Sequence, residues 1–134
     1  MTLQKIEFPK ILNPRGNLTF LQYPEQVPFE IQRVFWTYDV PGGEVRAGHA
    51  YRHQQELIIS LSGSFDIVVI FPDKTQQKFS LNRAYCGLYL PPLTWRHMEN
   101  FSTNSLALHI CSEPYSEMDY VRSFDEFQKL NIPR

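Results

Sequence analysis

The segment GEVRAGHAYRHQQELIISLSG, residues 43–63, decides the fold class. Its second half, Leu57 to Leu61, is rich in branched apolar residues that favour a β-strand. In its first half, His49, Tyr51 and His53 would share one face of an extended strand, because side chains alternate with a period of two. If His49 points into a barrel interior, Tyr51 does so too, and the interior then holds adjacent proton-handling groups.

Short β-rich runs of this kind recur along the chain, and turns containing proline or glycine separate them. Many short strands at this spacing are typical of a sandwich or a barrel. The five best candidates are Val34 to Tyr38, Leu57 to Leu61, Phe65 to Phe71, Ala84 to Leu90 and Ser105 to Cys111.

Only the C-terminal segment, Ser116 to Leu130, shows a different period. Its apolar residues recur at steps of three and four, which is the spacing of one helical face. The expected fold is therefore all-β with one or two short C-terminal helices packed on the barrel. The side chains expected to make that contact are Met118, Val121, Phe124 and Phe127.

The composition suits one domain spanning residues 1–134, which is long enough to bury a core. Thirteen basic and fourteen acidic residues nearly cancel and are scattered, so we expect neither nucleic acid nor an anionic membrane as a partner. No segment approaches the roughly 20 apolar residues that span a bilayer, and no signal peptide is visible. Cys86 and Cys111 lie in apolar runs, which favours buried reduced thiols over a disulfide or a nucleophile. We expect a cytoplasmic protein.

The spacing of four residues matches a known motif. Gly43, His49, Glu56 and Gly63 stand where the first cupin motif places Gly, His, Glu and Gly, with Tyr51 replacing the second His of the motif. A weaker echo of the second cupin motif lies at Gly87, Pro92, His97 and Asn100. The resemblance implies a cupin-type jelly-roll β-barrel.

A closer resemblance covers nearly the whole chain and is carried by five blocks. The chain resembles the sugar-nucleotide 3,4-ketoisomerases that act on dTDP-4-keto-6-deoxyglucose, also called WxcM-like cupins. The resemblance implies a homodimer that uses no metal or other cofactor and makes a dTDP-3-keto-6-deoxyhexose, a precursor of the 3-amino-3,6-dideoxy sugars of surface glycans. The blocks are Arg33 to Trp36, Arg46 to Arg52, Leu57 to Ser64, Gly87 to Trp95, and the most specific one, Ser112 to Arg122.

The chemistry of this family assigns roles to two residues. A proton at C3 lies next to the C4 ketone, so a positioned base can remove it and give an enediol. We assign His49 as that base, since an imidazole titrating near pH 6.5 suits reversible proton transfer. Tyr51 stands where the family has a second catalytic His. Its pKa near 10 makes it a poor base, but its hydroxyl can relay a proton or donate to an enolate.

The arginines of the matching blocks suggest how a nucleotide is held. Arginine clamps a diphosphate bidentately, although each could instead form a surface ion pair. Arg46 lies three residues before His49, so strand parity places it on the opposite face unless Ala47-Gly48 introduces a bulge. Trp95 could stack on a thymine ring. The expected substrate-binding set is Arg15, Arg33, Tyr38, Arg46, Trp95, Arg96 and His97.

Other functions remain open at this stage. Tyr51 favours a binding protein that kept the sugar-nucleotide pocket and lost turnover. His49, Glu56 and His97 could instead bind a metal ion. An epimerase is also possible, because it too begins by removing a proton beside a ketone. His53 is expected to be exposed, and His109 to be a hydrogen-bonded core histidine.

Overall fold

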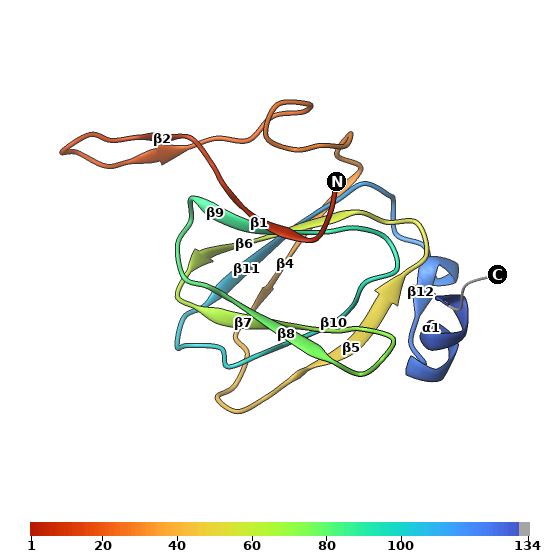
Figure 1. The fold of residues 1–134 in the computed structure, drawn as a ribbon. Coiled ribbons are helices and arrows are strands. Elements are labelled where there is room, and N and C mark those ends of the chain that lie inside the picture. Colours follow the sequence, from red (N-terminus) through yellow and green to blue (C-terminus); the bar gives the residue numbers. More distant parts are fainter. Residues whose placement is uncertain (132–134) are drawn as a thin grey trace.

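A computed structural model describes residues 1–131 and shows two antiparallel five-stranded sheets that pack face to face (Figure 1). This is the jelly-roll barrel that the sequence predicts. The strands of the first sheet, in spatial order, are β1 (Gln4–Glu7), β9 (Cys86–Leu90), β6 (Glu56–Ser62), β11 (Leu106–Cys111) and β4 (Arg33–Tyr38). Those of the second are β12 (Tyr120–Val121), β5 (Arg46–Tyr51), β10 (Trp95–Glu99), β7 (Phe65–Ile70) and β8 (Gln76–Leu81).

The barrel interior is apolar at one end. Ile58, Ile67, Val69, Leu88 and their neighbours form a buried cluster between the sheets. Burial of this apolar surface is the main favourable contribution to folding. Polar inward-facing side chains replace these residues at the other end of the barrel, where the candidate site lies.

The N-terminal segment covers the outer face of the first sheet. Phe8, Val27 and Phe29 pack against Leu57 and Ile59 of β6. The first part of strand β6 is therefore buried on both faces, which is why Leu57, Ile58 and Ile59 are consecutive apolar residues instead of alternating with polar ones. The hairpin β2 (Lys10–Ile11) and β3 (Leu18–Thr19) extends away from the barrel (Figure 1).

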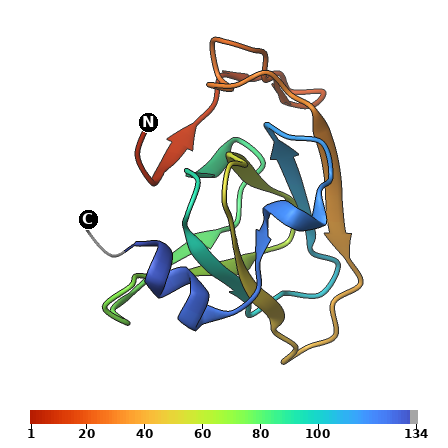
Figure 2. The same cartoon turned by 90° about the vertical axis from the view of Figure 1, so that its right-hand side faces the viewer.

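The C-terminal segment covers the second sheet, as the sequence predicts, but with less helix. A short 3-10 turn, Glu117–Asp119, leads into β12 and then into helix α1 (Phe124–Leu130), which lies beside the barrel (Figure 2). Val121 and Phe127 are buried against Trp95. The expectation for Met118 is wrong, since its side chain is 87% exposed. No helix among residues 1–131 is long and apolar enough to cross a membrane.

Candidate active site

A pocket of about 500 Å³ opens between the two sheets. Both sheets supply polar residues to its walls, so a ligand inside it would meet hydrogen-bonding groups from opposite sides. The first sheet contributes Thr37, Glu56 and His109, the second contributes Arg46, His49, Tyr51, Arg96 and Tyr120, and Arg122 follows directly after β12.

His49 and Tyr51 line the same wall of this pocket, as strand alternation predicts. Their ring centroids lie 4.8 Å apart in an edge-to-face arrangement. Tyr120 completes an aromatic cluster, and the Tyr51 hydroxyl donates to the Tyr120 hydroxyl at 3.2 Å. The cluster fixes the orientation of the imidazole and of both phenol rings.

Tyr51 keeps its proton. Burial, reinforced by the negative charge of Glu56, raises the pKa of Tyr51 far above its ordinary value of 10.0. The side chain is 2% exposed, so water does little to stabilise a phenolate. Tyr51 can therefore donate a hydrogen bond to a substrate oxygen but cannot act as a base near neutral pH.

A β-bulge brings Arg46 to the pocket. Strand β10 pairs with β5 through Arg96 opposite His49 and Met98 opposite Arg46, a step of two residues against three. The extra residue reverses the parity of β5 between Arg46 and His49. Both side chains therefore face the pocket, and the bulge considered for residues 47–48 is confirmed.

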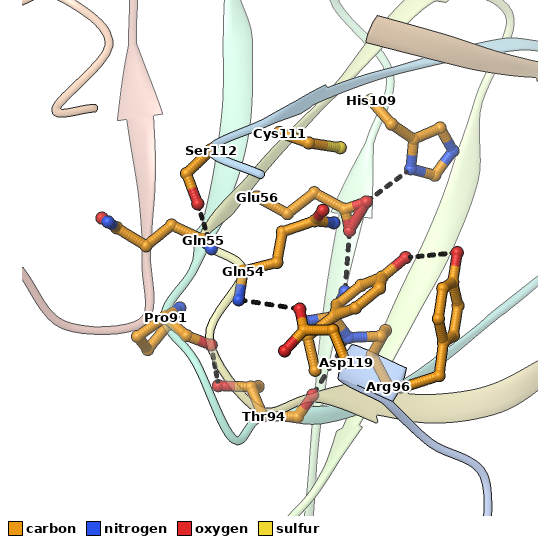
Figure 3. Close-up of polar contacts among 12 residues, drawn as sticks. Gln54, Gln55, Glu56, Pro91, Thr94, Arg96, His109, Cys111, Ser112 and Asp119 are labelled. Atoms are coloured by element: carbon orange, nitrogen blue, oxygen red, sulfur yellow. Dashed lines mark hydrogen bonds and ion pairs between the residues drawn. The ribbon is translucent and has the colours of Figure 1, made fainter. Parts of the chain in front are cut away.

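Glu56 is the electrostatic centre of the site. Its carboxylate accepts a hydrogen bond from Arg96 Nη1 at 2.7 Å and contacts His109 Nδ1 at 3.1 Å (Figure 3). Burial disfavours the charged carboxylate, but the His109 hydrogen bond and the Arg96 charge outweigh burial and lower the pKa of Glu56 to about 2. Arg96 also donates from Nε to the Thr94 carbonyl at 3.0 Å.

His109 belongs to the pocket. Its ring stacks on Phe35 with centroids 4.2 Å apart, and its Nε2 lies 3.1 Å from Thr37 Oγ1. It is hydrogen-bonded, as expected, but the sequence did not predict its position in the pocket. The apolar run of β11 hides the fact that alternate residues, Ala107 and His109 among them, face the barrel interior.

Two more pocket residues come from the block that best marks the family. Tyr120 and Arg122 line the pocket, and the Arg122 guanidinium lies over the Tyr120 ring at 4.3 Å. Arg33 projects from β4 over Phe35 and over Tyr115. The block Ser112 to Arg122 was thus a signal for Tyr120 and Arg122, although neither was expected in the site.

Five of the expected substrate-binding residues do not line the pocket, and one of them is Arg33, which lies beside Phe35. Trp95 and His97 point to the opposite face of β10 from Arg96, because neighbouring side chains alternate. Trp95 packs on Phe124 and Phe127 of α1. Tyr38 is 61% exposed on the outer face of β4, and Arg15 is exposed in the β2–β3 hairpin.

The orientation of His97 also separates the metal-ligand set considered above. His97 Nε2 contacts Glu99 Oε1 at 2.7 Å outside the pocket, whereas His49 and Glu56 lie inside it. Within residues 1–131, no three His, Cys, Asp or Glu side chains are grouped to hold a metal ion.

Both cysteines are free, as expected, but only Cys111 is buried, whereas Cys86 is partly exposed. Burial raises the pKa of the Cys111 thiol to about 12, which leaves it inert as a nucleophile. His53 is exposed, also as expected.

The fold and the site together define a small jelly-roll protein with an acid–base pocket between its sheets. The model of the family "WxcM-like, C-terminal" (FdtA) matches residues 1–131, and the chain belongs to this family. It is 33% identical, over 92% of its length and 88% of the relative's, to the TDP-4-oxo-6-deoxy-alpha-D-glucose-3,4-oxoisomerase of Aneurinibacillus thermoaerophilus.

Solved structures of two similar enzymes have the same fold. One is QdtA, a sugar 3,4-ketoisomerase from Thermoanaerobacterium thermosaccharolyticum in complex with TDP; its TM-score is 0.93 at 32% identity, over 96% of this chain and 93% of that one. The other is WlaRB, a TDP-quinovose 3,4-ketoisomerase from Campylobacter jejuni; its TM-score is 0.89 at 35% identity, over 95% of this chain and 97% of that one. The cupin-type barrel is confirmed.

Proposed function

We propose that the chain is a dTDP-sugar 3,4-ketoisomerase that converts dTDP-4-keto-6-deoxyglucose into a dTDP-3-keto-6-deoxyhexose. The observation that carries this proposal is the placement of His49 beside the protonated Tyr51 in a pocket of a WxcM-like barrel. The pocket volume of about 500 Å³ lies within the range of small-molecule sites. As expected of enzymes of nucleotide-sugar metabolism, we place it in the cytoplasm.

His49 performs the carbon chemistry in this proposal. The imidazole removes the C3 proton, which is acidified by the neighbouring C4 ketone, and the electron pair moves into a C3–C4 double bond with the charge on O4. The imidazole exchanges this proton with solvent and then delivers a proton to C4, which leaves the ketone at C3. One proton must also move from O3 to O4 for the atoms to balance.

Buried donors stabilise the negative charge that develops on the oxygens. Tyr51 has a hydroxyl that stays protonated, as its raised pKa requires. Arg96 is 2% exposed and uses Nη1 and Nε in the protein, whereas its buried Nη2 has no hydrogen-bond partner within residues 1–131. Fixed donors in a site shielded from water stabilise an enediolate more strongly than water does.

The phosphates are the expected ligands of the arginines at the pocket. Arg46 reaches the pocket through the bulge, and Arg122 lines it from beyond β12. Arg33 lies beside the Phe35 wall. These guanidinium groups can bind a diphosphate while the sugar occupies the space beside His49.

We also propose a homodimer, formed through the outer face of β4. This strand is the last of its sheet, and Val34, Trp36 and Tyr38 on its outer face are 45%, 57% and 61% exposed. An edge strand with a row of large exposed apolar residues is a site for association. The β2–β3 hairpin exposes Ile11 and Leu18 in the same way and carries Arg15, which would then lie against the second copy.

The test is incubation of the protein with dTDP-4-keto-6-deoxyglucose in deuterated buffer, followed by proton NMR. The proposal predicts a 3-keto product with deuterium at C4. The variant His49→Asn should lower the rate by about 10²-fold or more, the usual contribution of a general base. Tight dTDP binding without exchange in the wild type would instead identify a binding protein without turnover, the alternative that Tyr51 favours.

A further inference from the structure

We propose that Glu56, His109 and Thr37 form a proton relay that moves the proton between O3 and O4 of the substrate. This inference rests on the ketoisomerase function proposed above. That reaction needs two separate proton transfers, one between carbons and one between oxygens, and His49 accounts only for the first. The second needs a group that can both give and take a proton near neutral pH.

Tyr51 by itself does not meet this requirement: its pKa is raised far above the ordinary value and its hydroxyl is hydrogen-bonded to another phenol, that of Tyr120, so it could relay a proton only with a titratable group behind it. His109 is the other imidazole that lines the pocket within the described residues. It lies on β11 of the first sheet, whereas His49 lies on β5 of the second. A hexose held between the sheets can thus meet a carbon base on one side and a separate proton donor on the other.

The contacts of His109 order its ring for proton transfer. Ionised Glu56 can only accept, so the contact of 3.1 Å fixes a proton on Nδ1. The opposite nitrogen, Nε2, lies 3.1 Å from the Thr37 hydroxyl. Stacking on Phe35 at 4.2 Å holds the ring in this plane. The result is a carboxylate–imidazole–hydroxyl series whose last member, Thr37, faces the pocket.

The steps balance as follows. His109 begins with both ring nitrogens protonated, its charge balanced by Glu56. After His49 takes the C3 proton, Nε2 passes a proton through the Thr37 hydroxyl to O4, which gives a neutral enediol. As His49 delivers a proton to C4, the O3 proton passes back through Thr37 to Nε2. Thr37 touches the substrate, while Glu56 positions His109, and every residue ends in its starting state.

A matched pair of variants at Thr37 tests the relay. Thr37→Val removes the hydroxyl at nearly constant volume and should lower kcat by about 10²-fold or more, whereas Thr37→Ser should keep most of the activity. His109→Gln should resemble Thr37→Val. The affinity for dTDP should change by less than about threefold in each, since the loss concerns the chemical step. His53→Gln, at an exposed histidine, is the control and should keep the wild-type rate.

A second measurement separates the relay from a structural role. In Thr37→Val, exchange of the C3 proton with deuterium should persist while formation of the 3-keto product falls, because the enediolate returns to substrate. The ratio of exchange to product should therefore rise. An equal loss of both, together with lost dTDP binding, would overturn the relay in favour of a structural role.

Two further outcomes are distinguishable. If the wild type forms 3-keto product and Thr37→Val is equally fast, the relay is overturned and the proposed function stands. An inactive Tyr51→Phe variant would in that case assign the proton transfer between the oxygens to Tyr51. If the folded wild type binds dTDP but forms no product, the proposed function and the relay are overturned together.

Discussion

Glu56 illustrates how much of the site depends on one side chain. This residue is 1% exposed, and its carboxylate contacts both Arg96 of β10, in the second sheet, and His109 of β11, in the first. Such a buried charge is tolerated only because both partners contact it, and removal of one member leaves the others without a counter-charge. The residue therefore contributes to the stability of the barrel as well as to the arrangement of the pocket.

The depressed pKa of Glu56 predicts a specific dependence of stability on acid. The folded protein binds this proton with a pKa of about 2, and the unfolded chain with the ordinary value of 4.5. Protons therefore favour the unfolded chain, so the contribution of Glu56 to the unfolding free energy is complete above pH 4.5 and is lost as the pH falls toward 2. Glu56→Gln should flatten this part of the stability curve and, at pH 7, destabilise by about 3–5 kcal/mol because Arg96 is left buried without its partner.

Glu117→Gln is the matched control for urea unfolding at several pH values. The Glu117 carboxylate also has a pKa of about 2, from its contacts with Arg122 and Tyr115, but the pair is exposed to solvent. We expect a much smaller loss there, because solvent screens an exposed pair. Equal effects of the two substitutions would contradict the role assigned to burial at Glu56.

At this scale the sequence predicted the positions of His49 and Tyr51 better than their surroundings. Spacing and alternation were enough to place His49 and Tyr51 on one wall. The position of His109 depends on the register between β11 and β6, which no local pattern encodes. Trp95 and His97 were misplaced because the parity of β10 is fixed by its pairing with β7 and β5.

At the scale of elements, the bulge in β5 depends on a close contact with the neighbouring strand. A Cβ atom added at Gly48 would lie 2.8 Å from Trp95 Nε1, and the Trp95 ring is held by Phe124 and Phe127. Glycine is needed here for space and not for an unusual backbone angle. The bulge, the tryptophan and helix α1 thus form one packed unit behind His49.

This contact predicts the effect of Gly48→Ala. The added methyl group must displace Trp95 or widen the gap between β5 and β10, which should cost about 1–3 kcal/mol as overpacking does elsewhere. Thermal unfolding measures the loss. Gly42→Ala, where a Cβ would have no atom within 4 Å, is the control and should cost less. A Gly48→Ala variant with wild-type stability would contradict the prediction and show that Trp95 and α1 can move aside without cost.

The strands that the sequence missed have a common physical reason. Strand β8 is mostly polar and exposed, and β10 carries two charged residues, so neither forms an apolar run. Both are specified by pairing with β7, whose apolar character was evident. The C-terminal segment was predicted as more helical because Val121 fits a helical spacing as well as the β12 pairing with β5.

For the whole molecule, the proposed dimer gives a prediction at β4. Trp36→Glu places a charge in the centre of the exposed apolar row, where burial of a charge is costly. The variant should elute as a monomer where the wild type is a dimer, and light scattering after size-exclusion chromatography measures the mass. Lys78→Glu, on the outer strand β8 of the other sheet, should leave the mass unchanged. A monomeric wild type would contradict the proposal.

One face of strand β4 lines the pocket, and its other face is the proposed dimer surface. Phe35 and Thr37 point into the pocket, while Val34, Trp36 and Tyr38 point away from it. A shift of this strand caused by binding of a second copy therefore changes the affinity of the pocket for its ligand. By thermodynamic reciprocity, ligand binding changes the affinity for the second copy by the same factor. With the dimer proposed above, nucleotide-sugar should tighten self-association by the same factor by which self-association tightens nucleotide-sugar binding, so the apparent affinity of a dilute sample would depend on protein concentration.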